Sequence, residues 1–126
     1  MAAFVTLAGA SLIATALTSP TIAAAAAADG KRLYVRCLAC HSTAAGQPNK
    51  VGPNLHGFYG KKAASKPGFR YSAALSRSSV KWDDKALDAW LTRPSKLVPG
   101  TTMAFPGMTK PEERAALIAY LKNATK

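Results

Sequence analysis

The feature that most constrains this chain is a pair of cysteines separated by two residues and followed at once by a histidine, Cys37-Leu38-Ala39-Cys40-His41. This C-x-x-C-H spacing is the signature of covalent haem attachment. On a helical turn, residues at i, i+3 and i+4 face the same way, so both sulfurs and the imidazole can meet one flat cofactor. The motif therefore predicts a chain wrapped around haem c, with His41 as an iron ligand.

Two other chemistries compete for these cysteines. A structural zinc site needs four ligands, which could come from Cys37, Cys40 and the two histidines of the sequence, His41 and His56. Adjacent cysteine and histidine suit a zinc ligand pair poorly, however. A dithiol of the thioredoxin kind belongs to a βαβ pattern, and no run of strand alternation is present. Haem is the favoured interpretation, with zinc and dithiol as alternatives.

The N-terminal segment, residues 1–28, carries no charged side chain. Residues 2–17 are apolar, Pro20 interrupts them, and the alanines of residues 23–28 offer sites for cleavage. This arrangement predicts a secretory signal, with a retained membrane anchor as the alternative. The usual positive start is missing, which leaves open a true start upstream of this sequence. We expect residues 29–126 to form one exported, periplasmic domain, because haem is attached outside the cytoplasm.

The charge of the chain is strongly basic. Lys and Arg number 17 against 6 Asp and Glu, which gives a formal net charge of +11. Such an excess attracts acidic surfaces and speeds encounters with them. Nucleic acid is the competing partner, but the sequence has no zinc-finger spacing, no RNP-like run and no sustained basic helix. We therefore expect acidic protein faces as partners and no nucleic acid.

Three main helices are readable from the sequence. The first begins at residue 29 and ends in the cysteine motif, and the second covers residues 83–91, where Pro94 blocks its extension. The third runs to the end of the chain, and Thr109 and Glu112 predict a T-x-x-E capping box at its start. These patterns favour an all-α fold.

The segment between the first two helices is predicted to be mostly loop. Glycine and proline are dense across residues 44–66, which marks turns rather than a strand ladder. A short helix is expected over residues 72–77. The sequence shows no internal repeat and no coiled-coil heptads.

The sixth iron position decides the function of a haem with one histidine ligand. The candidates are Met103, Met108 and His56, since Met1 belongs to the leader. Met103 lies in the extended segment 99–105, just ahead of the last helix. A thioether ligand stabilises ferrous iron and raises the potential, and two filled axial positions leave only outer-sphere electron transfer.

Several separated motifs, in order, resemble those of the cytochrome c/c2 family, the class I cytochromes c. The resemblance spans about residues 30–122 and rests on residues 37–41, 52–57, 67–72, Trp82, residues 99–103 and residues 113–122. It implies three main helices plus short ones around one covalent haem, with the first and last helices crossing. It also implies a one-electron carrier of the respiratory chain, monomeric and not an enzyme.

The resemblance assigns ten cofactor-binding residues: Cys37, Cys40, His41, Pro53, Leu55, Tyr71, Trp82, Thr101, Met103 and Phe105. Met103 would be the sixth ligand, in preference to Met108 or His56, and His41 and Met103 together would hold the iron. The Pro53 carbonyl would accept a hydrogen bond from the His41 ring and so orient it. His56 would form hydrogen bonds within its loop.

The other assigned residues would surround the haem ring and its propionates. Tyr71 and Trp82 would donate hydrogen bonds to the propionates, and Thr101 would help to close that side. Leu55 and Phe105 would pack on the ring. Without the resemblance, each of these aromatic side chains would be read simply as core.

Four positions depart from the pattern common in the family. Trp90 stands where Tyr is frequent, Leu75 where Asn is frequent, and Lys61 where Arg is frequent. All three are expected to touch the haem surroundings and to influence the potential. Thr102 replaces a frequent Lys, which reduces the positive charge around the haem edge.

The remaining cations of the haem edge indicate how the protein would meet its partners. Arg36, Lys50, Lys96 and Lys110 match cationic positions of the family, and together they favour docking to an acidic face. The expected partners are a quinol–cytochrome c reductase, a terminal oxidase or a dehydrogenase. An enzyme or ligand sensor with a labile Met103 is a competing hypothesis. A cytochrome tethered by its leader is another, and only then would the membrane be a partner.

Overall fold

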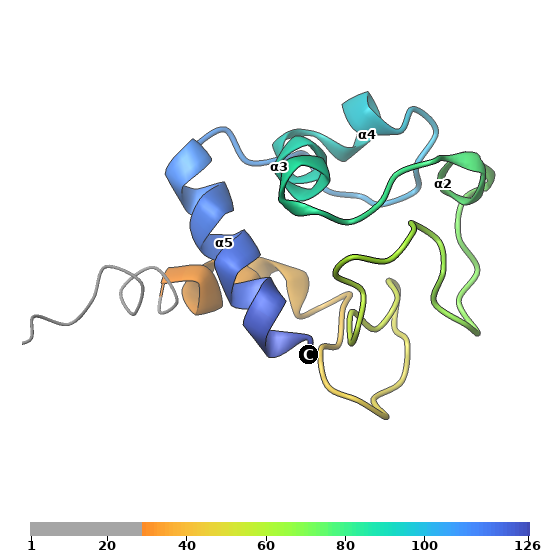
Figure 1. Cartoon of the computed structure of the whole chain (residues 1–126), viewed down its shortest axis with the longest axis horizontal. Helices are drawn as coiled ribbons and strands as arrows, with labels where there is room; N and C mark the ends of the chain where they lie inside the picture. The colour runs from red at the N-terminus through yellow and green to blue at the C-terminus, as the bar shows by residue number, and fades with distance from the viewer. Residues whose placement is uncertain (1–28) are drawn as a thin grey trace, which may run out of the picture.

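The computed structural model describes residues 29–126, and the predicted leader lies outside this part. Residues 29–34 are helical. The elements that follow are η1 (Val35–Cys37), α2 (Ala73–Arg77), α3 (Asp84–Thr92), α4 (Pro94–Leu97) and α5 (Pro111–Ala124). The described residues contain no strand, only an isolated antiparallel bridge between Lys62 and Lys81. The all-α prediction is confirmed (Figure 1).

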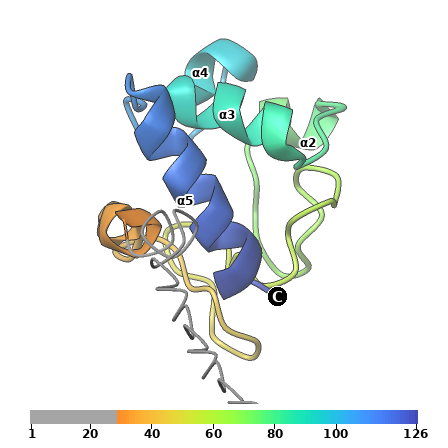
Figure 2. The ribbon, with the colours of Figure 1, turned by 60° about the vertical axis from the view of Figure 1, so that its left-hand side comes forward.

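The first helix and α5 cross at a point where one side chain is missing. A Cβ on Gly30 would collide with the carbonyl oxygen of Ala116 and the Cβ of Tyr120, so only glycine allows this approach. Nearby, the rings of Tyr34 and Tyr120 lie 5.5 Å apart between centroids. Figures 1 and 2 both show the N-terminal helix lying against α5. The crossing implied by the resemblance is therefore present.

Helix α3 begins where its sequence predicts. The Asp83 carboxylate accepts a hydrogen bond from the Ala86 amide at 2.8 Å and so caps the helix. Pro94 ends α3, as expected, but it also opens α4 as a first-turn residue. Helix α3 packs against both α4 and α5. Its buried face carries Leu87, Trp90 and Leu91.

The predicted capping box of α5 is wrong. The helix starts at Pro111, and its N-cap residue, Lys110, makes no side-chain capping bond. Proline has no N–H and a preset φ, so it favours the first helical position and leaves Thr109 one residue too early to cap. Glu112 and Glu113 still lie in the first turn, where they complement the helix dipole.

The long loop after the cysteine motif is held by side chains rather than by secondary structure. Asn54, which is buried, donates from its amide to the carbonyls of Ala44 and Gln47 at 2.8 and 2.9 Å. Its backbone N–H donates to Asn49 at 2.8 Å. The short helix expected after this loop is α2, and Ser72 caps it with a 3.1 Å bond. Among residues 29–126, no helix is long and apolar enough to cross a bilayer.

Candidate functional site

One large cavity, of about 600 Å³, lies between the loop that follows the first helix, the segment before α5, and the inner faces of α3 and α5. All ten residues assigned to the cofactor line it: Cys37, Cys40, His41, Pro53, Leu55, Tyr71, Trp82, Thr101, Met103 and Phe105. These residues come from segments far apart in the sequence. The fold therefore brings the whole predicted set to one place.

The cysteine motif forms a compact turn on one wall. The His41 amide donates to the Cys37 carbonyl at 2.8 Å, and the Cys40 amide donates to the same oxygen at 3.1 Å. Both thiols are free and half-buried. Burial raises the pKa of the Cys37 thiol, an effect that the Arg36 charge opposes. Both cysteines line the cavity, and they form no disulfide with each other.

The His41 ring is fixed through one of its nitrogens. Its Nδ1 lies 2.8 Å from the Pro53 carbonyl oxygen, and because that oxygen only accepts, Nδ1 carries the proton. The lone pair is then on Nε2. Desolvation lowers the pKa of His41, although the bond to Pro53 opposes this, and the Lys50 charge lowers the pKa further. The ring is thus held neutral and able to bind a metal.

Gly52 gives the ring the space it occupies. A Cβ at this position would come within 2.8 Å of Nδ1 and 2.9 Å of Nε2 of His41. The Gly52 amide also donates to the Cys40 carbonyl at 2.8 Å, which fastens the loop to the motif. The orientation of His41 therefore depends on a backbone that passes directly against the ring.

Met103 comes to the cavity from the segment between α4 and α5. Its side chain is partly buried, and its backbone is held locally, by a 3.0 Å bond from the Phe105 amide to the Met103 carbonyl. Met108 differs: it is 3% exposed, it belongs to the core, and it does not line the cavity. Of the two methionines in residues 29–126, only Met103 is placed to reach a cofactor there.

His56 takes its expected role only in part. Only its backbone forms hydrogen bonds: the amide donates to Asn54 at 2.9 Å, and the carbonyl accepts from Lys66 at 3.4 Å. Its ring Nδ1 is buried and has no hydrogen-bond partner among the described residues. His56 thus forms the expected hydrogen bonds within its loop through its backbone and not through its ring. The side chain lines the cavity.

The aromatic edge of the cavity combines one hydroxyl with a pair of indoles. The Tyr71 hydroxyl accepts a hydrogen bond from the Lys66 amide at 3.2 Å, which leaves its proton free to be donated. Burial raises the pKa of Tyr71, and the bond from Lys66 lowers it in part. The rings of Trp82 and Trp90 meet edge to face, 5.2 Å apart between centroids. These groups line the same cavity as Thr101.

Comparisons with known proteins agree with this arrangement. The sequence model of the family described as Cytochrome c matches residues 27–125. The chain belongs to the cytochrome c family. It is 43% identical to cytochrome c of Nigella damascena over 99 residues, which cover 78% of this chain and 89% of that one. Cytochrome c of Sesamum indicum is 45% identical over 98 residues, with coverage of 77% and 88%.

A solved structure supports the same assignment. Cytochrome cH from Methylobacterium extorquens superposes with a TM-score of 0.72 at 43% identity, covering 76% of this chain and 96% of that one. Cytochromes c hold haem c covalently through C-x-x-C-H, and this chain carries that motif at residues 37–41. It is therefore a haem-binding electron carrier that works with redox partner proteins. The resemblance seen in the sequence is confirmed.

The residues of this cytochrome c fit the cofactor. The cavity is lined mostly by apolar and aromatic side chains, as a porphyrin ring requires, and both cysteines of the motif are among its lining residues. His41 is neutral, with Nε2 free to bind iron. The polar groups that line the same cavity, such as Tyr71 and Thr101, suit the charged propionate groups of haem.

Sequence reasoning missed part of the wall. Leu87 and Leu91 of α3, and Leu117 and Leu121 of α5, also line the cavity. Their helical spacing predicts a buried face, but it does not say whether that face meets another helix or a cofactor. Trp90 and Leu75, two of the departures from the family pattern, lie in this apolar wall as well.

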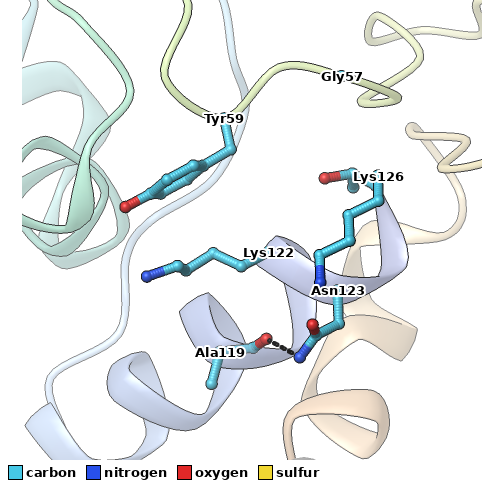
Figure 3. A pocket seen from close by; sticks show the side chains of 7 residues that line it. Gly57, Tyr59, Ala119, Lys122, Asn123 and Lys126 are labelled. Carbon is cyan, nitrogen blue, oxygen red and sulfur yellow. Dashed lines mark hydrogen bonds between the residues drawn. The ribbon is translucent and has the colours of Figure 1, made fainter.

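The zinc alternative finds no support. Within residues 29–126, no group of three or more His, Cys, Asp or Glu side chains is arranged to hold a metal ion. A second hollow, of about 520 Å³, has no cysteine or histidine and is lined by Gly57, Tyr59, Ala119, Lys122, Asn123, Thr125 and Lys126 (Figure 3). At its edge Lys122 lies over the Tyr59 ring, 4.8 Å from the centroid, and contacts Asp84 at 3.0 Å. This hollow shares Gly57 with the lining of the haem cavity.

Proposed function

We propose that this cytochrome carries single electrons by outer-sphere transfer, with His41 and Met103 as axial ligands of a haem c bound to Cys37 and Cys40. The observation that supports this most directly is that Met103 lines the same cavity as the cysteine motif while Met108 does not. When bound, the haem supplies an iron that changes oxidation state by one electron. Two axial protein ligands keep small molecules away from that iron.

The surrounding residues prepare the cavity for this role. The Pro53 carbonyl orients His41 and raises the basicity of its free nitrogen. Leu55 and Phe105 pack on the ring and exclude water, which lowers the local dielectric. Tyr71, Trp82 and Thr101 donate hydrogen bonds to the propionates. These assignments rest on the shared cavity and on the family pattern.

The optical spectrum of the holoprotein tests the ligand pair. The ferric native protein should show the weak far-red band of sulfur-to-iron charge transfer, and Met103→Ala should abolish it. Met108→Leu is the matched control, because it conserves volume and changes a methionine that does not line the cavity. A band that survives Met103→Ala, or that disappears in Met108→Leu, contradicts the assignment.

Binding of CO separates the carrier from the competing hypothesis. A six-coordinate carrier binds CO to its reduced iron slowly, if at all, because Met103 occupies the site. Prompt CO binding by the native reduced protein would instead assign a ligand sensor or a peroxide-reactive enzyme. A low-spin Met103→Ala variant that becomes high-spin on adding His56→Ala would identify His56 as a substitute ligand.

We also propose that partners with acidic faces meet the haem edge. Arg36, Lys50 and Lys96 are exposed, whereas the charge of Lys110 is paired with Glu113 at 3.3 Å. The expected partners are a quinol–cytochrome c reductase or a dehydrogenase on the donor side and a terminal oxidase on the acceptor side. Electron-transfer rates should fall with rising ionic strength, since salt screens exposed charges. A rate independent of salt contradicts the docking proposal.

The proposed location is the periplasm, with residues 1–28 acting as a signal peptide and residues 29–126 as a monomeric domain. The leader pattern and the need for haem attachment outside the cytoplasm support this proposal. Determination of the mature N-terminus tests it: a start near residues 24–29 indicates cleavage. Recovery of residues 2–17 in the membrane fraction indicates a tethered cytochrome instead.

A further inference from the structure

The charges of this chain are unevenly distributed along the sequence. Residues 30–82 contain ten Lys and Arg and no Asp or Glu, and the six acidic residues lie at position 29 and within residues 83–113. The four ion pairs of the described residues draw only one cation, Arg32, from the basic stretch. Nine cations of residues 30–82 therefore have no carboxylate partner within the part of the chain that the structure describes.

Two of these cations are held face to face. The isolated antiparallel bridge places Lys62 directly opposite Lys81, and both side chains are exposed. The backbone around them is fixed by hydrogen bonds, from Ala63 to Val80 at 2.8 Å and from Trp82 to Lys61 at 2.9 Å. Like charges at opposed positions of antiparallel strands destabilise the pair. The fold thus fixes the backbones of two like-charged residues opposite each other, and we call Lys62 and Lys81 the bridge pair.

The nearest acidic residues in the sequence are occupied elsewhere. The Asp83 carboxylate caps α3 at the Ala86 amide, 2.8 Å away. Asp84 accepts hydrogen bonds from the Tyr59 hydroxyl at 2.8 Å and from Lys122 at 3.0 Å. Neither carboxylate forms an ion pair with Lys62 or Lys81. Among the described residues, no carboxylate offsets the repulsion within the bridge pair, of which Lys62 also lines the haem cavity.

We propose that the bridge pair, Lys62 and Lys81, is a second docking surface for an acidic protein face, used in addition to the cations of the haem edge. A partner carboxylate between the two ammonium groups attracts both and removes their mutual repulsion. The hydrogen-bonded backbone keeps the two lysines side by side, so one acidic face can meet both. The proposal does not depend on which residues bind the iron.

A protein partner fits this surface better than a lipid bilayer does. Proteins that bind at a membrane surface combine cations with apolar side chains that enter the headgroup region. The exposed large apolar residues of the described chain are Val35, Leu38, Val51 and Tyr59, and none of them lies in residues 60–82. The bridge pair offers charge without an inserting side chain, which suits the fixed carboxylates of a folded partner.

Titration of the ¹⁵N-labelled holoprotein with poly-L-glutamate at low salt tests the proposal. The variant pair is Lys62→Gln with Lys81→Gln, and the matched control is Lys31→Gln with Lys85→Gln, two exposed lysines in no ion pair of the described residues. Amide signals around both bridge lysines should shift in the native protein. The bridge variant should bind about fivefold more weakly, as two exposed ion pairs are lost.

The control variant should bind poly-L-glutamate less than about twofold more weakly than the native protein. The two charges that it removes attract the polymer only from a distance, where salt screens them. The bridge variant should also unfold at the same or a higher denaturant concentration than the native protein, since it loses a repulsion. Equal weakening in the two variants would show a response to net charge alone and overturn the proposal. So would unshifted amides around the bridge.

Vesicles of phosphatidylglycerol provide the final discrimination. If the bridge variant loses affinity for poly-L-glutamate and keeps most of its affinity for vesicles, the protein-docking proposal is supported. If it loses vesicle binding and keeps poly-L-glutamate binding, the surface belongs to a membrane contact and the proposal is wrong. Absorption spectra of the variants, unchanged from the native protein, show that the haem site is intact in both experiments.

Discussion

The two sides of the haem cavity are built differently. On the His41 side, the ring itself is fixed: Nδ1 donates to Pro53 at 2.8 Å, and Gly52 passes against the ring. On the Met103 side, the residues of the cavity form only short local contacts, such as the 3.5 Å approach of the Met103 amide to the Thr101 hydroxyl. On the His41 side, a hydrogen bond holds the ligand's own ring. On the Met103 side, the hydrogen bonds hold the backbone near the ligand and not its side chain.

The Met103 side is anchored a few residues further along the chain. The Met108 amide donates to the Leu91 carbonyl at 2.7 Å. The buried Arg114 donates from Nη1 to the Met108 carbonyl at 2.9 Å and from Nε to Asp88 at 2.7 Å. A substitution must therefore disturb the loop of residues 52 and 53 to displace His41. Met103, in contrast, can be displaced by substitutions at residues 107–114 that it does not contact by a hydrogen bond.

The largest effect should come from Gly107→Ala, on the Met103 side. Gly107 has φ +112°, and a Cβ there would collide with the Thr92 carbonyl of α3. Strain and a backbone clash together should lower the free energy of unfolding by about 3 kcal/mol. The far-red sulfur band should weaken while the haem stays covalently attached. Denaturant unfolding measures the stability, and the ferric spectrum measures the band. An undiminished band would show that residue 107 does not help to hold Met103 in place.

A somewhat smaller effect is expected from Gly52→Ala, on the His41 side. The new methyl group would overlap the His41 ring, and overpacking of this kind costs about 2 kcal/mol of unfolding free energy. Gly46→Ala is the control: its φ is +75° and nothing lies near its Cβ, so only backbone strain of about 1 kcal/mol applies. His41 is expected to be held more firmly than Met103. This expectation would be wrong if Gly52→Ala lost more His41 ligation than Gly107→Ala lost Met103 ligation.

Arg114→Lys should weaken the anchor of the Met103 side with a smaller loss of stability. Lysine keeps the charge but cannot donate to Asp88 and to the Met108 carbonyl together, so the free energy of unfolding should fall by about 1 to 2 kcal/mol. These contacts anchor the Met103 segment. As the pH is raised, the sulfur band of the variant should therefore disappear at a lower pH than the band of the native protein. A pH titration of the ferric spectrum measures this, and an unchanged midpoint would show that the anchor stabilises the fold alone.

The smallest effect should come from Asp84→Asn, which touches neither side of the cavity. Hydrogen bonds from Tyr59 and Lys122 lower the pKa of Asp84 below its usual 3.8. A lowered folded-state pKa stabilises the fold above pH 3.8, and the gain is lost as the pH falls through the folded-state pKa. Native and variant proteins should therefore differ slightly in stability near neutral pH and converge in acid. The far-red sulfur band and the rest of the ferric spectrum should stay unchanged.

The helices were largely predictable because local signals mark their ends. Asp83 caps α3, Ser72 caps α2, and the spacing of Leu117 and Leu121 marks the buried face of α5. The errors also have local causes. Pro111 displaced the predicted capping box, and Pro94, which ends α3, also opens α4 as its first residue.

The candidate site was predictable where a motif names the residue and unpredictable where only geometry does. The C-x-x-C-H run predicts Cys37, Cys40 and His41 as haem-binding residues, and the family resemblance supplies the other seven that line the same cavity. The unpaired Nδ1 of His56 and the opposition of Lys62 to Lys81 left no trace in the sequence. Both depend on how distant loops meet, which a residue pattern does not specify.

The contact of Gly30 with Ala116 and Tyr120 has a consequence for the order of events during biosynthesis. The helix that leads into the cysteines is packed by residues near the opposite end of the chain. Until α5 has been made and has come back to it, that helix lacks this packing partner. The cysteine motif therefore follows a helix whose packing depends on a distant segment, so closing the fold around the cavity requires a long-range contact and not a local one.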